Sequence, residues 1–304
     1  MDARPPVRGR GDRMLVYGRC RCLVGAAAAL GAAAAVGAQT PVDPSRPRPA
    51  LKRAEELVSV RTLLDTEPIG PGETFHLAVV FDVEPKWHIY WKNPGAGALP
   101  LVVTVTAPEG FRVAEPIWTR PRVFDTAEGE EYGYETQAVL FVPITAPGTL
   151  SQEPVEIRCR IRWAVCKDVC LLGDVQRSVV VQTARRPGEP PRRLPPLLRK
   201  HLKRLPRPLT KIAGGSVTFR DGVITLSGPA GGTTVVKFLP EESPGVTYSP
   251  LEASITGDRF KVRVQVTFDP KNALGEPMAL GGLVALGENA DDPCYDFRLD
   301  SPVP

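Results

Sequence analysis

Apolar and charged residues alternate strictly in one stretch of the chain, residues 155–163 (VEIRCRIRW). The odd-numbered positions are apolar or cysteine, and the even-numbered positions are charged. This period of two is typical of a β-strand with one face in a core and the other in solvent. The pattern ends at Trp163, and Cys166 and Cys170 follow directly. We therefore expect both cysteines where the strand gives way to a loop, close enough to form a disulfide.

Weaker versions of this pattern predict further strands on either side. Residues 73–83 carry apolar side chains at alternate positions, and shorter runs occur at 101–106, 138–144 and 178–182. Proline and glycine turn signals separate these runs. Residues 118–134 hold prolines and glycines without a clear period, which favours a long loop. Short strands at this spacing predict an all-β fold, a sandwich of about 130 residues.

A second group of strand signals follows residue 211 and predicts a smaller β-sandwich-like domain in residues 212–304. Its expected strands are residues 223–227, 233–239, 260–268, 279–286 and 295–299. Residues 184–211, between the two domains, are basic and proline-rich. Leucines and His201 recur there at helical spacing, between Pro195 and Pro206. We expect a linker with one short helix, whose basic face is solvated or contacts an acidic surface.

The first 38 residues are typical of a secretory signal peptide. Six arginines precede an apolar segment, Leu23–Val36, and small residues then allow cleavage after Ala38. An uncleaved anchor is the alternative, but a membrane span needs about 20 apolar residues. Residues 39–54 begin with a proline- and arginine-rich stretch, which predicts disorder.

Removal of the signal peptide changes the charge balance. The whole chain has 38 basic and 34 acidic residues, and the first 38 residues hold six arginines and two aspartates, which leaves 32 of each. A near-neutral mature chain gives no reason to expect a nucleic-acid partner. No later stretch is apolar enough to span a bilayer, so we expect no transmembrane segment in the mature chain.

The Cys166–Cys170 pair has three chemical interpretations. Export would place it in an oxidising compartment, which favours a disulfide. That disulfide is either a local staple, worth roughly 2 kcal/mol for so short a ring, or a redox pair that opens and closes. Lys167 would lower a thiolate pKa, and Asp168 would oppose it. Copper handling by the two thiolates and His88 is the third interpretation, because soft thiolates select Cu(I).

The remaining candidate residues point to packing rather than chemistry. Cys159 lies on the apolar face of its strand and is expected to be a buried, inert thiol. Cys294 is expected in a loop, and no pattern supports a bond between these two cysteines. His88, in the aromatic segment 87–95, is expected to be a structural histidine. The sequence has no phosphate-binding glycine loop, nucleophile elbow or zinc-protease motif, and we expect no cofactor.

Residues 55–183 resemble the N-terminal periplasmic domain of the DsbD thiol:disulfide interchange family, including its ScsB-like branch. The resemblance rests on four motifs in order: 87–95 (WHIYWKNPG), 108–111 (PEGF), 132–135 (YGYE) and 163–170 (WAVCKDVC). It implies an immunoglobulin-like fold in which Cys166 and Cys170 are a redox-active pair. Family members cover their pair with a loop that carries an aromatic residue. The best local match here is the loop 120–132 with Phe124.

The resemblance also implies a function and a set of supporting residues. The chain would be a periplasmic thiol–disulfide oxidoreductase component that relays electrons from a membrane-embedded thiol reductant to periplasmic disulfide proteins. Family members continue into a transmembrane region and a thioredoxin-like domain. We recognise neither in this sequence, so we expect the reductant to be a separate protein. Trp163 and Phe124 would shield the sulfurs, Lys167 would stabilise a thiolate, and Tyr132 and Tyr134 are further candidates beside the pair. The alternative is a redox-silent module of two β-sandwiches that binds a partner and keeps its disulfide closed.

Overall fold

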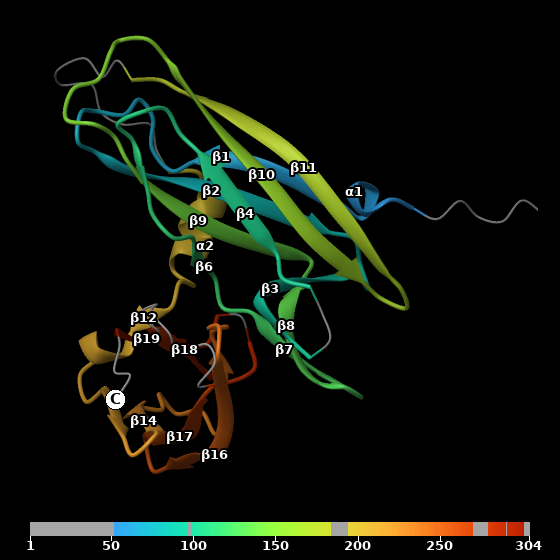
Figure 1. Cartoon of the computed structure of the whole chain (residues 1–304), viewed down its shortest axis with the longest axis vertical. Helices are drawn as coiled ribbons and strands as arrows, with labels where there is room; N and C mark the ends of the chain where they lie inside the picture. The colour runs from blue at the N-terminus through green and yellow to red at the C-terminus, as the bar shows by residue number, and fades with distance from the viewer. Residues whose placement is uncertain (1–51, 97–98, 184–193, 270–278, 290, 301–304) are drawn as a thin grey trace, which may run out of the picture. The chain divides into compact units, whose positions relative to one another are not determined.

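A computed structural model describes residues 52–96, 99–183, 194–269, 279–289 and 291–300. The expected signal peptide, most of the expected disordered segment and residues 184–193 of the expected linker lie outside these ranges. From Leu51 onward the chain forms one compact unit. Its regular structure is almost entirely β-strand (Figure 1), which confirms the all-β fold class. No helix within the described ranges is both long and apolar enough to cross a bilayer.

The first part of the chain is an immunoglobulin-like sandwich of two antiparallel sheets. One sheet has the order β1-β2-β9-β5, with β6 also paired to β9: β1 (Val58–Leu64), β2 (Thr74–Val83), β9 (Gln137–Thr145), β5 (Arg112–Val113) and β6 (Ile117–Trp118). The other has the order β11-β10-β3-β8-β7, with β4 also paired to β10: β11 (Cys170–Val181), β10 (Val155–Cys166), β3 (His88–Gly95), β8 (Gly129–Glu135), β7 (Arg122–Thr126) and β4 (Val102–Thr106).

The period of two decides which side chains of β10 enter the core. Ile157, Ile161 and Val165 are fully buried and belong to one apolar cluster with residues of β2 and β9. Full burial of one such side chain stabilises the fold by roughly 1.5–3 kcal/mol. The arginines between them face solvent. The alternation therefore predicts correctly both the strand and its inward face.

The cysteines lie where a strand gives way to a turn, as expected: β10 ends at Cys166, and the paired strand β11 begins at Cys170. One expectation about loops is wrong. Residues 118–134, expected to be a long loop, form most of the β7–β8 hairpin. Gly133 of that hairpin faces β3 so closely that a Cβ would lie 2.2 Å from the carbonyl oxygen of Ile89. The glycine that suggested a loop is thus required by close strand packing.

A short helix covers the outer face of the first sheet. Helix α2 (Pro196–Leu202) begins at the expected proline. Its Leu198 is fully buried in an apolar cluster with Ala78, Val80 and Phe141. The helix is therefore packed on the sandwich, and β2 is buried on both faces. At the other end of the chain's described part, the four-residue helix α1 (Ala54–Leu57) contributes Ala54 and Leu57 to the main core.

The second part of the chain has two four-stranded sheets and its own apolar core. One sheet has the order β12-β19-β18-β15: β12 (Arg207–Pro208), β19 (Cys294–Asp300), β18 (Ala279–Leu286) and β15 (Val236–Pro240). The other has the order β13-β14-β17-β16: β13 (Ser216–Arg220), β14 (Val223–Pro229), β17 (Arg259–Phe268) and β16 (Val246–Thr256). A 3-10 turn, η1 (Leu209–Lys211), precedes them. All five expected strands occur; β12, β13 and β16 are additional.

The second part also contacts strand β3 directly. The Lys92 ammonium lies 2.6 Å from the Glu241 carboxylate, and the Asn93 side-chain amide donates to the Pro240 carbonyl at 2.8 Å. The buried Arg120 guanidinium donates to the Leu286 carbonyl at 2.6 Å. These contacts connect the second core to the sheet that carries the cysteine pair.

Candidate redox site at the end of the sandwich

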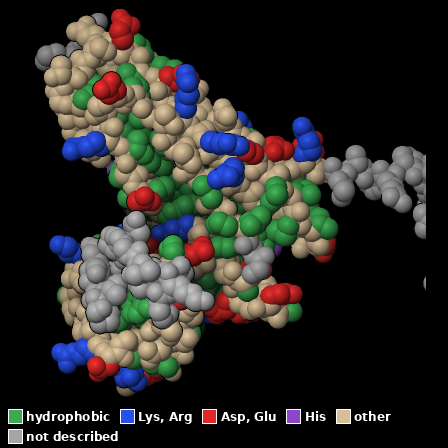
Figure 2. Space-filling view, in the orientation of Figure 1, with side chains coloured by type: hydrophobic (Ala, Val, Ile, Leu, Met, Phe, Trp, Pro, Cys, Tyr) green, Lys and Arg blue, Asp and Glu red, His purple; other side chains and the backbone are tan. Residues whose placement is uncertain are grey.

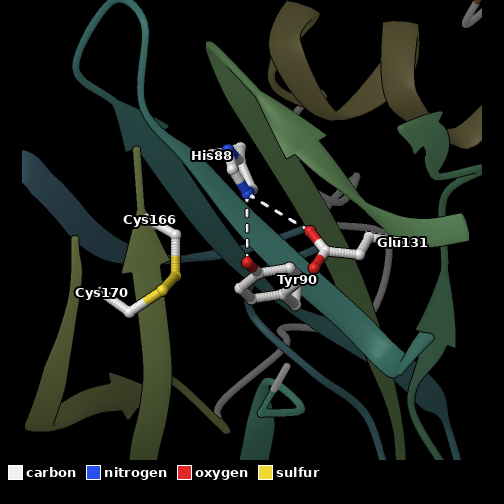
Figure 3. Close-up of a disulfide and its surroundings, with 5 residues drawn as sticks. All are labelled: His88, Tyr90, Glu131, Cys166 and Cys170. Atoms are coloured by element: carbon white, nitrogen blue, oxygen red, sulfur yellow. Dashed lines mark hydrogen bonds and ion pairs between the residues drawn. A yellow bond between two sulfur atoms is a disulfide. The ribbon is translucent and has the colours of Figure 1, made fainter. Parts of the chain in front are cut away.

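Cys166 and Cys170 are brought together by strand register. Cys166 ends β10, Cys170 begins β11, and the two residues are direct cross-strand partners. Their Cα atoms are 4.2 Å apart and their sulfurs are bonded (Figure 3). The N–H of Lys167 donates to the Val169 carbonyl at 3.1 Å and closes the three-residue turn between them. The disulfide is thus a consequence of the hairpin geometry.

The two cysteines differ sharply in exposure. Cys166 is only 3% exposed, and it forms a small buried cluster with Ala164 and Tyr90 on the outer face of the sheet. Cys170, at the start of the edge strand β11, is exposed. Access is one of the factors that decide which sulfur of a disulfide is attacked. Cys170 is therefore the side of the bond that solvent and other molecules reach.

A polar cluster of three residues lies beside Cys166. His88 of β3 is the cross-strand partner of Cys166, and directly opposed residues have Cβ atoms about 4.5–5.5 Å apart. The Nε2 atom of His88 is 3.2 Å from the Tyr90 hydroxyl oxygen and 3.9 Å from a carboxylate oxygen of Glu131. Figure 3 shows His88 and Tyr90 extending from β3 toward Glu131 of β8, with the disulfide on the other side of His88. The cluster therefore lies next to the buried sulfur.

Burial and charge set the protonation states of this cluster. Burial lowers the pKa of His88, and the nearby Glu131 and Glu135 carboxylates oppose that shift only in part. Burial, followed by the charge and a hydrogen bond of Glu131, raises the pKa of Tyr90 to about 12. At neutral pH His88 is therefore mainly a neutral imidazole, and the Tyr90 phenol keeps its proton. Cys166 has a neutral hydrogen-bonding neighbour and no adjacent cation in this cluster.

Residues 54–182 match the family model described as "Thiol:disulfide interchange protein DsbD, N-terminal". This range contains both sheets of the first sandwich and the disulfide hairpin. Residues 54–182 form a DsbD N-terminal-like domain. The match bears out the resemblance and makes this domain a thiol–disulfide exchange module.

One solved structure agrees with this assignment at the level of the fold. The N-terminal periplasmic domain of ScsB from Proteus mirabilis is 20% identical, with a TM-score of 0.53, and the match covers 82% of this chain and 96% of that one. The match with the N-terminal domain of Neisseria meningitidis DsbD in the reduced form is 13% identical, covers 48% of this chain and 96% of that one, and has a TM-score of only 0.29. Comparison with curated proteins gives no match.

Three of the expected supporting residues of the DsbD N-terminal-like domain lie in its core. Trp163 is 2% exposed and faces inward, on the opposite face of β10 from Cys166. Tyr132 and Tyr134 belong to the same core cluster, and the Tyr134 hydroxyl donates to the Thr119 carbonyl at 2.7 Å. Strand alternation forces this result, because odd and even positions point to opposite faces. These side chains support the fold beneath the site.

The other two supporting residues lie nearer to the pair. Phe124 of β7 packs against His88, with ring centroids 5.1 Å apart, so it borders the polar cluster. Lys167 is in the exposed turn between the cysteines, where its ammonium lies 3.5 Å from the Asp168 carboxylate. No described contact joins the Phe124 ring or the Lys167 ammonium to either sulfur. A direct role in shielding or thiolate stabilisation stays a prediction for both.

Tyr90 and Glu131 were not expected at the site. The alternation of His88 and Tyr90 with the fully buried Ile89 and Trp91 is visible in the sequence and predicts a shared face. Which strand lies beside that face depends on the pairing of β3 with β10 and β8, and local pattern does not encode it. His88, expected to be structural, is therefore placed beside Cys166 by tertiary pairing alone.

The two remaining described cysteines are buried free thiols. Burial raises the pKa of Cys159, as expected for an inert core thiol. Burial likewise raises the pKa of Cys294 to about 12. Cys294 was expected in a loop, but it is the first residue of β19 and is shielded by that sheet. Among the residues that the structure describes, no group of three or more His, Cys, Asp or Glu side chains is arranged to hold a metal.

Proposed function

We propose that this protein relays electrons through Cys166 and Cys170 between a membrane-embedded thiol reductant and periplasmic disulfide proteins. The observation that carries the proposal is the asymmetric disulfide of the DsbD N-terminal-like domain, with one cysteine exposed and the other buried. A purely structural disulfide needs no such difference in exposure. Exchange needs one sulfur that a partner can reach and a second sulfur that leaves as a thiolate and later re-forms the bond. Thiol–disulfide exchange requires no cofactor.

The direction of the bond favours attack on Cys170. Displacement at sulfur places the incoming, central and leaving sulfurs in line. The bond runs from β10 toward the edge strand β11, so an attacker of Cys170 comes over the open side of the sheet. An attacker of Cys166 would have to come from the side of β3, where His88 lies. The geometry therefore supports Cys170 as the sulfur that meets a partner.

The reaction then follows in two balanced steps. A thiolate of a dithiol reductant attacks Cys170, a mixed disulfide forms, the Cys166–Cys170 bond breaks, and Cys166 leaves as a thiolate that takes a proton from water. The second thiolate of the reductant then attacks the reductant's first sulfur, which is bonded to Cys170, and releases Cys170 as a thiolate. Two electrons have moved to the pair, and the reductant holds a new disulfide. The reverse sequence, begun by the Cys170 thiolate, reduces a target disulfide.

His88 is the group best placed to assist the buried leaving sulfur. A thiolate at Cys166 forms in a desolvated position, where an unpaired charge is costly. An imidazole N–H on the neighbouring strand would stabilise that charge by hydrogen bonding. Tyr90 and Glu131 hold one ring nitrogen of His88 and so fix the orientation of the ring. The cluster would thus set the stability of the reduced state.

The proposed periplasmic location and the proposed partners are supported by the N-terminal sequence and the ScsB neighbour, and not by the geometry of the disulfide. A basic segment followed by an apolar one at the N-terminus favours export. The ScsB neighbour is described as a periplasmic domain. An exported exchange module needs a source of electrons on the far side of the membrane, and a membrane-embedded thiol reductant supplies one.

Trapping of a mixed disulfide tests this function. The oxidised wild-type protein and its Cys166→Ser and Cys170→Ser variants would be mixed with reduced thioredoxin as a dithiol probe. We expect the wild type to be reduced. After oxidation with a small aromatic disulfide, the Cys166→Ser variant should form a stable mixed disulfide through Cys170 with a thioredoxin whose resolving cysteine is replaced by serine, because no second thiolate can then release Cys170. A wild type that stays oxidised under excess probe would instead identify a redox-silent binding module.

A further inference from the structure

Strand β11 ends its sheet with an open edge next to the disulfide. Within the described ranges β11 pairs only with β10. The N–H groups of Asp174 and Gln182 point away from β10, because Glu55 and Glu67 accept hydrogen bonds from them at 3.4 and 3.2 Å. In an antiparallel pair, alternate residues turn both backbone groups to the same side. Cys170 and Leu172 therefore present their N–H and C=O groups to this edge, where no described strand or side chain binds them.

The open part of the edge is short and apolar. Glu55 of helix α1 closes it at Asp174. Val169 and Leu172, on either side of Cys170, are 51% and 68% exposed. Figure 2 shows hydrophobic side chains gathered over the end of the sandwich where the β10–β11 hairpin turns. Exposed apolar side chains grouped around a reactive site mark a contact surface.

A cavity of about 370 Å³ lies behind Leu172. Its walls include Leu99, Pro100, Val102 and Arg162, and Leu99 is itself 54% exposed. Arg160 forms an ion pair with Asp174, and Arg158 forms one with Glu156, but no described carboxylate pairs with Arg162. Asp174, the cross-strand partner of Arg162, also lines the cavity, but its carboxylate is bound by Arg160. The cavity is thus mainly apolar, and the Arg162 guanidinium in its wall has no ion pair with a described carboxylate. It complements an apolar side chain accompanied by a carboxylate.

We propose that the exchange partner docks here as an added strand, an extended segment whose cysteine faces Cys170. An apolar side chain two residues from that cysteine packs on Leu172 and enters the cavity behind it, and an acidic residue of the same segment faces Arg162. Strand addition of this kind draws affinity from backbone hydrogen bonds and specificity from side-chain pockets. It also delivers the partner's sulfur over the edge, along the line that attack on Cys170 requires. This proposal rests on the exchange function proposed above.

Synthetic cysteine peptides test the proposal. The reference peptide is acetyl-Glu-Gly-Leu-Gly-Cys-Gly-Leu-Gly-Glu-amide, which places leucines two residues and glutamates four residues from the cysteine on both sides, all on the face of the cysteine. One comparison peptide replaces both leucines by serine, and a second replaces both glutamates by lysine. A third is N-methylated at the cysteine nitrogen, whose N–H faces β11 in the proposed pairing. The measured quantity is the second-order rate constant for opening the disulfide of the full chain, corrected for the thiolate fraction of each peptide. Mercaptoethanol serves as a small thiol without a docking segment.

The wild-type protein should favour the reference peptide over the serine peptide by about tenfold, the factor that corresponds to partial burial of one leucine. It should also react faster with the reference peptide than with the lysine and N-methylated peptides. Leu172→Ser should remove the preference for leucine, and Arg162→Gln should remove the preference for glutamate. Leu251→Ser is the matched control, since Leu251 is 52% exposed on the distant strand β16. Mercaptoethanol should react at the same rate with all four proteins.

Two results would overturn the docking proposal. Equal rates for all peptides with the wild type would exclude a specific segment at this edge. A leucine preference that survives in Leu172→Ser, or in the N-methylated peptide, would exclude strand addition beside Cys170. Failure of the exchange function can be told apart from failure of the docking proposal. In that case mercaptoethanol, like the peptides, would leave the disulfide closed.

Discussion

Cys166 and Cys170 share a bond but have different surroundings. Cys166 lies beneath Tyr90 and beside His88, whereas Cys170 is on an exposed edge strand. A buried thiol gains little from ionisation, because desolvation disfavours the charged form. Reactivity at this disulfide is therefore governed by position in the hairpin more than by the sequence between the cysteines.

Single-cysteine variants should show this difference directly. In Cys166→Ala the remaining Cys170 thiol should react with iodoacetamide at least about tenfold faster than the Cys166 thiol of Cys170→Ala, because thiol reactivity follows access and thiolate character. Rates would be measured by mass spectrometry of quenched samples. In denaturant the two variants should react alike, which controls for intrinsic reactivity. Equal rates in the folded state would contradict the assignment of Cys170 as the accessible sulfur.

His88 should set the ionisation of the reduced pair. Replacing His88 by Leu removes the hydrogen-bonding ring beside Cys166, so we expect the pKa of the Cys166 thiol to rise by about one unit. The reduction potential should fall by about 30 mV, which corresponds to about 1.4 kcal/mol for this two-electron couple. Absorbance of the thiolate against pH and equilibration with glutathione would measure the two quantities. His88→Gln keeps an N–H donor and should restore most of the wild-type thiol pKa and reduction potential. If His88→Leu changes neither quantity, His88 does not stabilise the Cys166 thiolate.

At the scale of elements, the predictable features are those that local alternation encodes. The apolar face of β10, the strand β2 and the start of α2 at Pro196 all follow from periodicity and proline position. The start of β11 and the β7–β8 hairpin do not. Residues 170–177 break the alternation, since Gly173 lies where a Cβ would be 2.3 Å from the Trp163 ring. At this position the close packing of β10 against β11 requires a glycine, and the glycine interrupts the alternation of apolar and polar residues.

The docking of α2 should contribute measurably to stability. Leu198 is fully buried between the helix and the outer face of β2 and β9. Leu198→Ala should lower the free energy of unfolding by about 2–4 kcal/mol, because a leucine-to-alanine change in a core loses transfer energy and leaves a cavity. Denaturant unfolding would measure the loss. Leu197→Ala, at a half-buried position of the same helix, should cost clearly less.

His201 gives the same helix a pH dependence. Burial, reinforced by the positive charges of Arg204 and Lys200, lowers the pKa of His201 to about 4, from 6.5. Above pH 6.5 the imidazole is neutral in both states, and its contribution to stability is complete. As the pH falls from 6.5 to 4 the unfolded chain binds a proton that the folded chain refuses, so stability is lost.

Unfolding free energies measured across this range should fall by no more than about 3 kcal/mol on account of His201, since one pKa unit is worth about 1.4 kcal/mol. Denaturant midpoints at several pH values would provide them. His201→Gln can still approach Gln137, the hydrogen-bond partner of His201 at 2.9 Å, and should show a flatter profile. A profile as steep as that of the wild type would assign the pH dependence to other groups.

At the scale of the whole molecule, the sequence predicts the class and order of the parts better than their contacts. Both β parts, the short helix between them and the cysteine pair in the first are found where the pattern places them. The hydrogen bonds from Lys92 and Asn93 of β3 to the second part join residues about 150 positions apart, a separation that no local pattern reports. The same limit applies to the site, because the pairing of His88 with Cys166 joins two distant segments.

The most direct test of the relay is the reduction potential of the Cys166–Cys170 disulfide in the chain without its first 38 residues. Thiol trapping after equilibration in glutathione or dithiothreitol buffers would give the value. An exchange module should lie between about −120 and −270 mV and should equilibrate rapidly. A potential below about −300 mV, reached only slowly, would contradict the account and mark a structural disulfide.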